Sequence, residues 1–100
     1  MQIIIGKSIG GELIVGKLEE KDNKVVITDA YSVVTYSDPE TDQLRSIIVP
    51  IFAPFDVKAI KEISIDKMVA VIDAPEEVQQ VYIKLTTGLD IVSAGTKIVQ

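Results

Sequence analysis

The chain is 100 residues long, is 47% hydrophobic and carries a formal net charge of −5. This length supports one domain with one core. Cysteine and histidine are both absent, which excludes disulfides, the common zinc sites and catalysis by a Ser–His or Cys–His pair. No apolar run approaches the ~20 residues of a membrane helix, and the first residues lack the basic start of a signal peptide, so a cytoplasmic protein is expected.

The first half of the chain has the pattern of strands joined by short turns. Residues 3–9 are an apolar run that ends at the glycine pair of residues 10–11, a typical turn. Residues 12–20 alternate between apolar and polar side chains, and residues 25–36 are rich in Val, Ile, Thr and Tyr. The polar segment between them, residues 21–24, predicts a hairpin.

The next segments predict two further strands. Residues 44–52 are mostly apolar but contain Pro50, which has no amide hydrogen to donate and therefore belongs at a sheet edge or a bulge. Residues 60–72 predict a fifth strand with a bend at residues 66–67.

The periodicity then changes to that of a helix. Apolar side chains recur at i, i+3, i+4 and i+7, in Val78, Val81, Tyr82 and Leu85. This spacing predicts a helix over residues 75–87. Asp73 is the expected N-cap, with Glu76 as its partner in a capping box. In the tail, residues 89–100, a short strand is expected around Ile98.

Together these elements predict an all-β fold in a single domain of residues 1–100. The expected architecture is a small, strongly bent, five-stranded antiparallel barrel over residues 3–72, with strands ordered as in the sequence. One C-terminal α-helix follows at residues 75–87.

One pattern in the first half resembles a known family. Gly11, four residues, Gly16, one residue and Leu18 precede a polar hairpin and the segment Ile27-Thr28-Asp29-Ala30. This pattern resembles the first motif of the Sm/LSm proteins. Proline and aromatic residues at 51–55 stand where that family has Arg-Gly, which is similar to the divergent small Sm-like proteins of marine cyanophages.

The resemblance implies an SH3-like barrel whose second strand bends sharply. A glycine at such a bend removes the Cβ atom that would clash, so Gly16 is expected where no side chain fits. The resemblance also implies a homo-oligomeric ring in a bacterial or phage-infected cell. Such a ring would bind single-stranded RNA, or DNA, with low sequence specificity.

The hairpin turn is the expected nucleic-acid contact, because a ring would gather its lysines around one opening. With two further lysines near turns, the candidate nucleic-acid-binding residues are Lys21, Asp22, Asn23, Lys24, Lys58 and Lys67. The hairpin has no aromatic residue to stack on a base, and Arg-Gly is missing, so a uridine-specific pocket is not expected. The alternative is an ordinary solvated turn.

The resemblance also implies that the fourth and fifth strands are the free edges through which neighbouring subunits pair. The candidate interface residues are Ile47, Val49, Ile51, Phe52, Ile60, Ile63 and Ile65.

The alternative function is an assembly module that binds copies of itself or other proteins without nucleic acid. An enzyme is not expected, because the carboxylates and lysines form no recognisable catalytic arrangement. The acidic loop of Asp38, Glu40 and Asp42 lacks the glycine and the bidentate glutamate of a calcium loop. No metal or cofactor is therefore expected.

Overall fold

The computed structural model describes residues 2–53, 55–56 and 58–87. The strands are β1 (Gln2–Ser8), β2 (Leu13–Lys21), β3 (Lys24–Ser37), β4 (Leu44–Val49), β5 (Ile60–Ser64) and β6 (Met68–Asp73). A short 3-10 turn, η1 (Ile65–Lys67), joins β5 to β6, and the helix α1 (Glu76–Thr87) follows β6. The chain is therefore all-β with one C-terminal helix, which confirms the predicted fold class. The strand expected around Ile98 lies outside the described residues.

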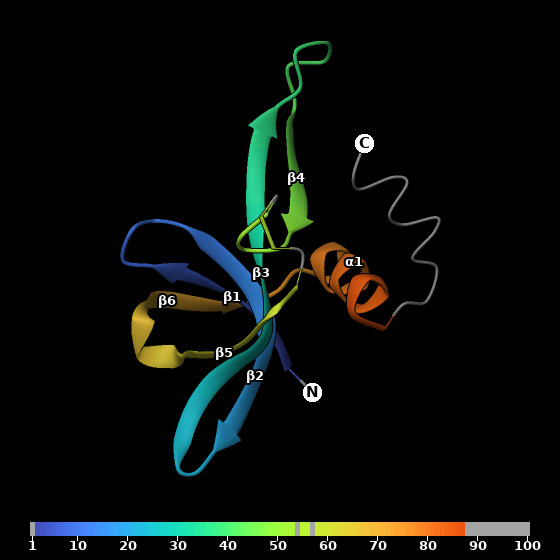
Figure 1. Cartoon of the computed structure of the whole chain (residues 1–100). Helices are drawn as coiled ribbons and strands as arrows, with labels where there is room; N and C mark the ends of the chain where they lie inside the picture. Colours follow the sequence, from blue (N-terminus) through green and yellow to red (C-terminus); the bar gives the residue numbers. More distant parts are fainter. Residues whose placement is uncertain (1, 54, 57, 88–100) are drawn as a thin grey trace.

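All strands pair antiparallel in one sheet, ordered β4-β3-β2-β1-β6, with β5 also paired to β3 (Figure 1). The prediction that strands follow sequence order is wrong at two places, because β5 lies beside β3 rather than beside β4, and β6 lies beside β1 rather than beside β5. β3 is 14 residues long. One edge of this long strand accommodates two short strands in succession, β5 along residues 26–30 and β4 along residues 32–37.

The predicted count of five strands is also wrong, because residues 60–72 form two strands. β5 pairs with β3, whereas β6 pairs with β1 on the far side of the sheet. The chain must turn to reach its second partner, and η1 makes this turn at the predicted bend. Since η1 joins the two ends of the path β5-β3-β2-β1-β6, the sheet curls on itself into a small barrel.

Two predicted boundaries need correction. β4 ends at Val49 and not at residue 52, because Pro50 cannot donate to a ladder and its carbonyl accepts the N–H of Ala53 at 3.0 Å, which turns the chain. Asp73, the predicted helix cap, is instead the last residue of β6. It accepts a hydrogen bond of 2.6 Å from the side-chain amide of Gln2.

Apolar side chains on the two faces of the sheet form two clusters. Successive strand residues point to opposite faces, so the neighbours Ile3 and Ile4 belong to different clusters. The interior of the barrel is built around Ile4, Ile14, Ile27 and Ala30. On the outer face, α1 covers Ile3, Val15, Ile48 and Ala74 with Tyr82 and the partly buried Val78, Val81 and Leu85.

The sharpest irregularity of the sheet is a β-bulge in β3 opposite Gly16. Val15 pairs with Tyr31 and Lys17 pairs with Thr28, so two residues of β3 stand opposite one residue of β2. Asp29, one of these two, has a φ of 49°, in the left-handed region that aspartate tolerates better than most residues. A Cβ atom on Gly16 would overlap Cγ2 of Ile27 and lie 2.9 Å from the Thr28 carbonyl oxygen. Gly16 therefore lies where the sequence predicts, at a point with no room for a side chain.

We expect Gly16→Ala to lower the free energy of unfolding by about 1–3 kcal/mol, because the new methyl group meets backbone and a packed isoleucine. Gly6→Ala is the matched control in the neighbouring strand. There the Cβ atom would meet the thioether of Met68, a flexible group that can rotate away. Urea unfolding of both variants measures the difference, and an equal cost for the two would contradict this explanation of Gly16.

Candidate functional site

The predicted hairpin turn is present at the end of β2 and β3. Lys21 pairs with Lys24, and the two residues between them, Asp22 and Asn23, have φ angles of 51° and 64°. Two consecutive residues with positive φ are typical of a type I′ turn, which Asn and Asp favour. All four residues are exposed, so the first four predicted nucleic-acid-binding residues lie together at one tip of the molecule.

Carboxylates lie beside the positive charges of this hairpin. The Lys21 ammonium is 3.4 Å from Oε2 of Glu62 on β5 and 4.0 Å from Glu19. Lys17, further along β2, forms an ion pair of 3.2 Å with Asp29. Exposed pairs of this kind add little stability, but they cancel the local positive potential that a phosphate would feel.

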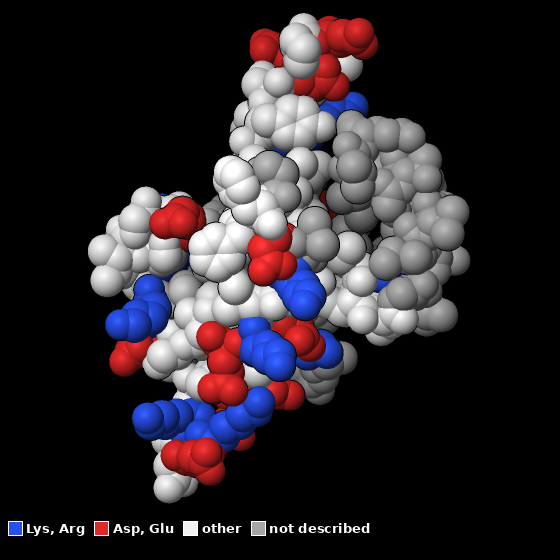
Figure 2. All heavy atoms as spheres, viewed as in Figure 1, with Lys and Arg blue, Asp and Glu red and all other residues white. Residues whose placement is uncertain are grey.

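The other two predicted nucleic-acid residues lie at opposite ends of β5. Ser64 of β5 pairs with Val26, so Lys67 follows the end of β5 that is nearer the hairpin turn. Lys58 precedes the other end, where Ile60 pairs with Ala30. The structure therefore does not gather the six residues into one patch. Figure 2 shows lysine and acidic side chains interleaved over this lower part of the molecule and acidic residues at the tip of the β3–β4 hairpin.

Most of the predicted interface residues serve the subunit's own core. Ile51, Ile60, Ile63 and Ile65 are partly buried against the barrel interior. Ile47 and Val49 on β4 are half-buried, and Phe52 is exposed in the turn after β4. These residues therefore do not form one continuous exposed surface.

β6 is an exposed surface that the sequence patterns did not predict. Val69, Val71 and Ile72 are 63%, 40% and 59% exposed. β6 pairs with β1 along one edge, and no strand in the described part of the chain pairs with its other edge. The signal was present in the sequence, because residues 68–72 are an apolar run without a charge or a proline. The pattern of residues 60–72 predicts one long strand and does not indicate which part of it is exposed.

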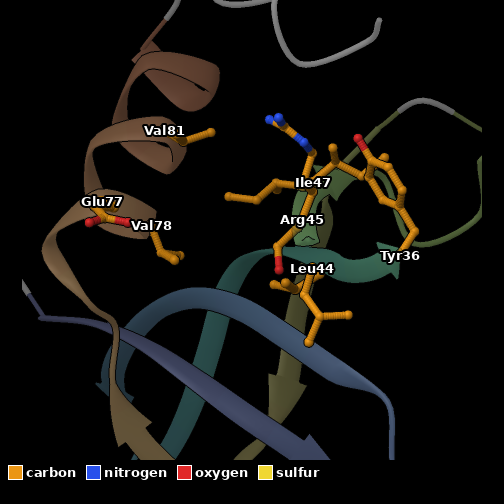
Figure 3. A pocket seen from close by; sticks show the side chains of 10 residues that line it. Tyr36, Leu44, Arg45, Ile47, Glu77, Val78 and Val81 are labelled. Atoms are coloured by element: carbon orange, nitrogen blue, oxygen red, sulfur yellow. The ribbon is translucent and has the colours of Figure 1, made fainter. Parts of the chain in front are cut away.

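A groove of about 450 Å³ lies between α1 and the β3–β4 hairpin. Val81 on α1 points across it toward Ile47 on β4, and Val78 also lines the groove from α1 (Figure 3). Leu44, Arg45 and other residues of the hairpin line the opposite wall. Arg45 also donates a 3.0 Å hydrogen bond to Asp38. The backbone N–H of Glu40, and secondly Arg45, lower the pKa of the Asp38 carboxyl. The groove thus has a mainly apolar lining, and its charged lining residues are Arg45 and Glu77.

Four ionisable residues meet at the bulge: Lys17, Asp29, Tyr31 and Tyr82. The hydroxyl of the fully buried Tyr82 donates a hydrogen bond of 2.7 Å to the Asp29 carbonyl. The rings of Tyr31 and Tyr82 meet edge to face at 6.1 Å. Burial, and secondly the negative charge of Asp29, raises the pKa of both tyrosines. The Tyr82 hydroxyl is therefore a neutral donor that holds the backbone and is poorly suited to acid–base catalysis.

No protein-family model matches this chain, and no curated protein sequence matches it. In residues 2–53, 55–56 and 58–87, no three potential ligand side chains lie close enough together to hold a metal ion. The same residues contain no helix with the length and apolar character needed to cross a bilayer.

We expect Tyr82→Phe to lower the free energy of unfolding by about 1–2 kcal/mol, because the Asp29 carbonyl loses its donor in a buried place. Tyr36→Phe is the matched control, since Tyr36 is exposed on the outer part of β3. Urea unfolding of the two variants is the measurement, and a Tyr82→Phe variant as stable as the parent would contradict the role given to this hydroxyl.

The raised pKa of Tyr82 also predicts an alkaline loss of stability. Below about pH 10 Tyr82 is protonated in both the folded and the unfolded protein, so its hydroxyl makes its full contribution to the free energy of unfolding. Above that pH the unfolded chain loses the proton while the folded protein keeps it, so the free energy of unfolding falls as pH rises. Urea midpoints between about pH 8 and pH 11 should fall more steeply for the parent than for Tyr82→Phe. Parallel curves would contradict this assignment.

Proposed function

We propose that this protein is a self-assembly module, in which copies of the barrel associate through exposed strand edges. The observation that carries the proposal is the apolar surface of β6, an edge strand with large hydrophobic side chains open to solvent. An apolar strand edge of this kind associates with another strand unless it is covered or charged. Exposed apolar patches on small proteins commonly mark interaction sites.

The charge distribution favours assembly over nucleic-acid binding. The chain has a formal net charge of −5, and its ion-paired lysines include Lys17 and Lys21 of the β2–β3 hairpin. Binding of a phosphate backbone depends on lysine and arginine charges that are free to replace counterions. In the hairpin that the sequence predicts for this purpose, Lys17 is paired with Asp29, and Lys21 is paired with Glu62 and Glu19.

The resemblance to Sm-like proteins supports the same proposal in part. That resemblance implies association through strand edges, which the exposed β6 edge is suited to provide. Its further implications, a closed ring and the binding of single-stranded RNA or DNA, remain predictions.

Self-assembly is tested by light scattering during gel filtration at micromolar concentration. We expect a mass of two or more subunits of 10.9 kDa each, because an isolated subunit would leave the β6 edge in water. A mass of one subunit over the whole concentration range would overturn the proposal.

A second measurement separates assembly from nucleic-acid binding. Fluorescence anisotropy with labelled single-stranded RNA and DNA is recorded at low salt and at about 150 mM salt. We expect no binding at the higher salt. Tight binding that weakens steeply with salt, and that Lys21→Glu with Lys24→Glu abolishes, would instead establish the hairpin as a phosphate-binding site.

A further inference from the structure

The strand β4 has an edge that pairs with no strand in the part of the chain that the structure describes, because its partner there is β3. The groove of about 450 Å³ between α1 and the β3–β4 hairpin follows this strand. Five consecutive residues of β4 line it: Leu44, Arg45, Ser46, Ile47 and Ile48. Successive side chains of a strand point to opposite faces, so a groove that all five line reaches the edge of β4 and does not cover one face alone. The groove therefore gives access to the open edge of this strand.

The apolar side chains that line this groove are incompletely covered. Leu44 and Tyr36 are 77% and 41% exposed, and Ile47 is half-buried. On the opposite wall, Val78 and Val81 of α1 are also only partly buried. An extended segment in the groove would bury apolar surface against both walls while it satisfies the backbone groups of the open edge of β4.

The charges of the groove define the complementary occupant further. Of its two charged lining residues, Arg45 is already paired with Asp38 at 3.0 Å. Glu77 is exposed, and no cation pairs with it in residues 2–53, 55–56 and 58–87. The unpaired charge of the groove is therefore negative. A segment with one basic residue among apolar, strand-forming residues matches both the charge and the apolar walls.

The chain itself contains a segment of this chemistry. The thirteen residues 88–100 follow α1 in the sequence, and α1 forms one wall of the groove. Lys97 is the basic residue of this segment, and Thr96, Ile98 and Val99 around it are residues that favour strands. The large apolar residues of the segment are Leu89, Ile91, Val92, Ile98 and Val99.

The segment is long enough to reach the groove of its own molecule. Val81 lies six residues before Thr87, the last residue of α1, which is about 9 Å along the helix axis. β4 has six residues and is therefore about 20 Å long. Thirteen extended residues span up to about 40 Å. The segment can therefore return past α1 and still lie along the whole of β4.

We propose that residues 89–99 occupy the groove of their own molecule, with the part around Ile98 added to the open edge of β4 as a further strand. Because both faces of β4 contribute to the lining, the adjacent side chains of Ile98 and Val99 each find apolar contacts, and Lys97 lies near Glu77. A segment tethered to α1 has an effective concentration on the order of millimolar, which favours it over a free peptide of equal affinity. This inference goes beyond the proposed function and does not depend on it.

A segment in this position closes β4 to neighbouring subunits. The head-to-tail ring that the resemblance implies uses the fourth strand as one of its two edges. Such a ring therefore requires residues 89–99 to leave the groove, since one strand edge pairs with one strand at a time. β6 lies at the other end of the sheet order and is not affected.

The first test is a chemical cross-link in the full chain, which has no cysteine of its own. Ser46 lines the groove and is exposed, so Ser46→Cys with Ile98→Cys places one thiol on each side of the proposed contact. A short bis-maleimide reagent, which tolerates a shift in register, should join the two thiols within one chain. Ser8→Cys with Ile98→Cys is the matched control, because Ser8 ends β1 at the β1–β2 hairpin, on the far side of the molecule from α1 (Figure 1). The control should react roughly tenfold more slowly. Equal rates, or a link between two chains, would overturn the inference.

The second test is amide hydrogen exchange of β4 in the full chain. About every second N–H of an edge strand points away from its partner strand and exchanges quickly unless another strand covers it. We expect these amides of β4 to be protected in the parent and to exchange roughly tenfold faster in Ile98→Asp, because a carboxylate is disfavoured in an apolar groove. Gln100→Asp adds the same charge two residues further along and is the control, which should exchange like the parent. Equal exchange of β4 in all three proteins would show that residues 89–99 do not cover this edge.

Discussion

The backbone of β3 leaves regular strand geometry at Asp29, and the shape of the barrel depends on how this step is accommodated. The residue has a positive φ, and the strand places two residues opposite Gly16. Gly16 fits because it has no Cβ atom to meet Ile27 and the Thr28 carbonyl. The buried hydroxyl of Tyr82 then donates to the Asp29 carbonyl, which joins the bulge to the helix. A side chain at position 16 would clash with this part of β3, and loss of the Tyr82 hydroxyl would leave the Asp29 carbonyl without its buried donor.

The bulge also explains how one strand takes part in two different pairings. β3 runs through the whole molecule (Figure 1), with β5 beside its first part and β4 beside its second part. The bend between these parts is what a bulge produces, since the extra residue increases the local twist. The barrel interior around Ile4 and Ile27 lies on one face of this sheet, and the outer cluster under α1, which contains Tyr82, lies on the other face.

Two parts of the surface, the β2–β3 hairpin and β6, bear on the proposal that the protein assembles with copies of itself. Lys17 and Lys21 of the β2–β3 hairpin are paired with carboxylates, which lowers the positive potential around these two side chains. Apolar side chains on β6 are open to water instead. Both observations support the proposal of assembly through strand edges. Pairing of an exposed strand satisfies backbone groups and buries hydrophobic surface, and neither effect needs a positive patch.

Local patterns in the sequence were sufficient for the features that local physics decides. The hairpin turn at residues 21–24, the helix stripe of Val78 to Leu85 and the need for glycine at position 16 all follow from spacing and residue type. Which strand pairs with which was beyond these patterns, because pairing joins residues far apart in the chain. For the same reason the sequence did not reveal that residues 60–72 divide between β3 and β1, or that the lysines lie beside carboxylates from other strands. The sequence also did not predict that β6 has an open edge, because the same apolar pattern occurs in buried and in exposed strands. Only the tertiary structure decided these points, because the burial and pairing of a strand depend on its neighbours.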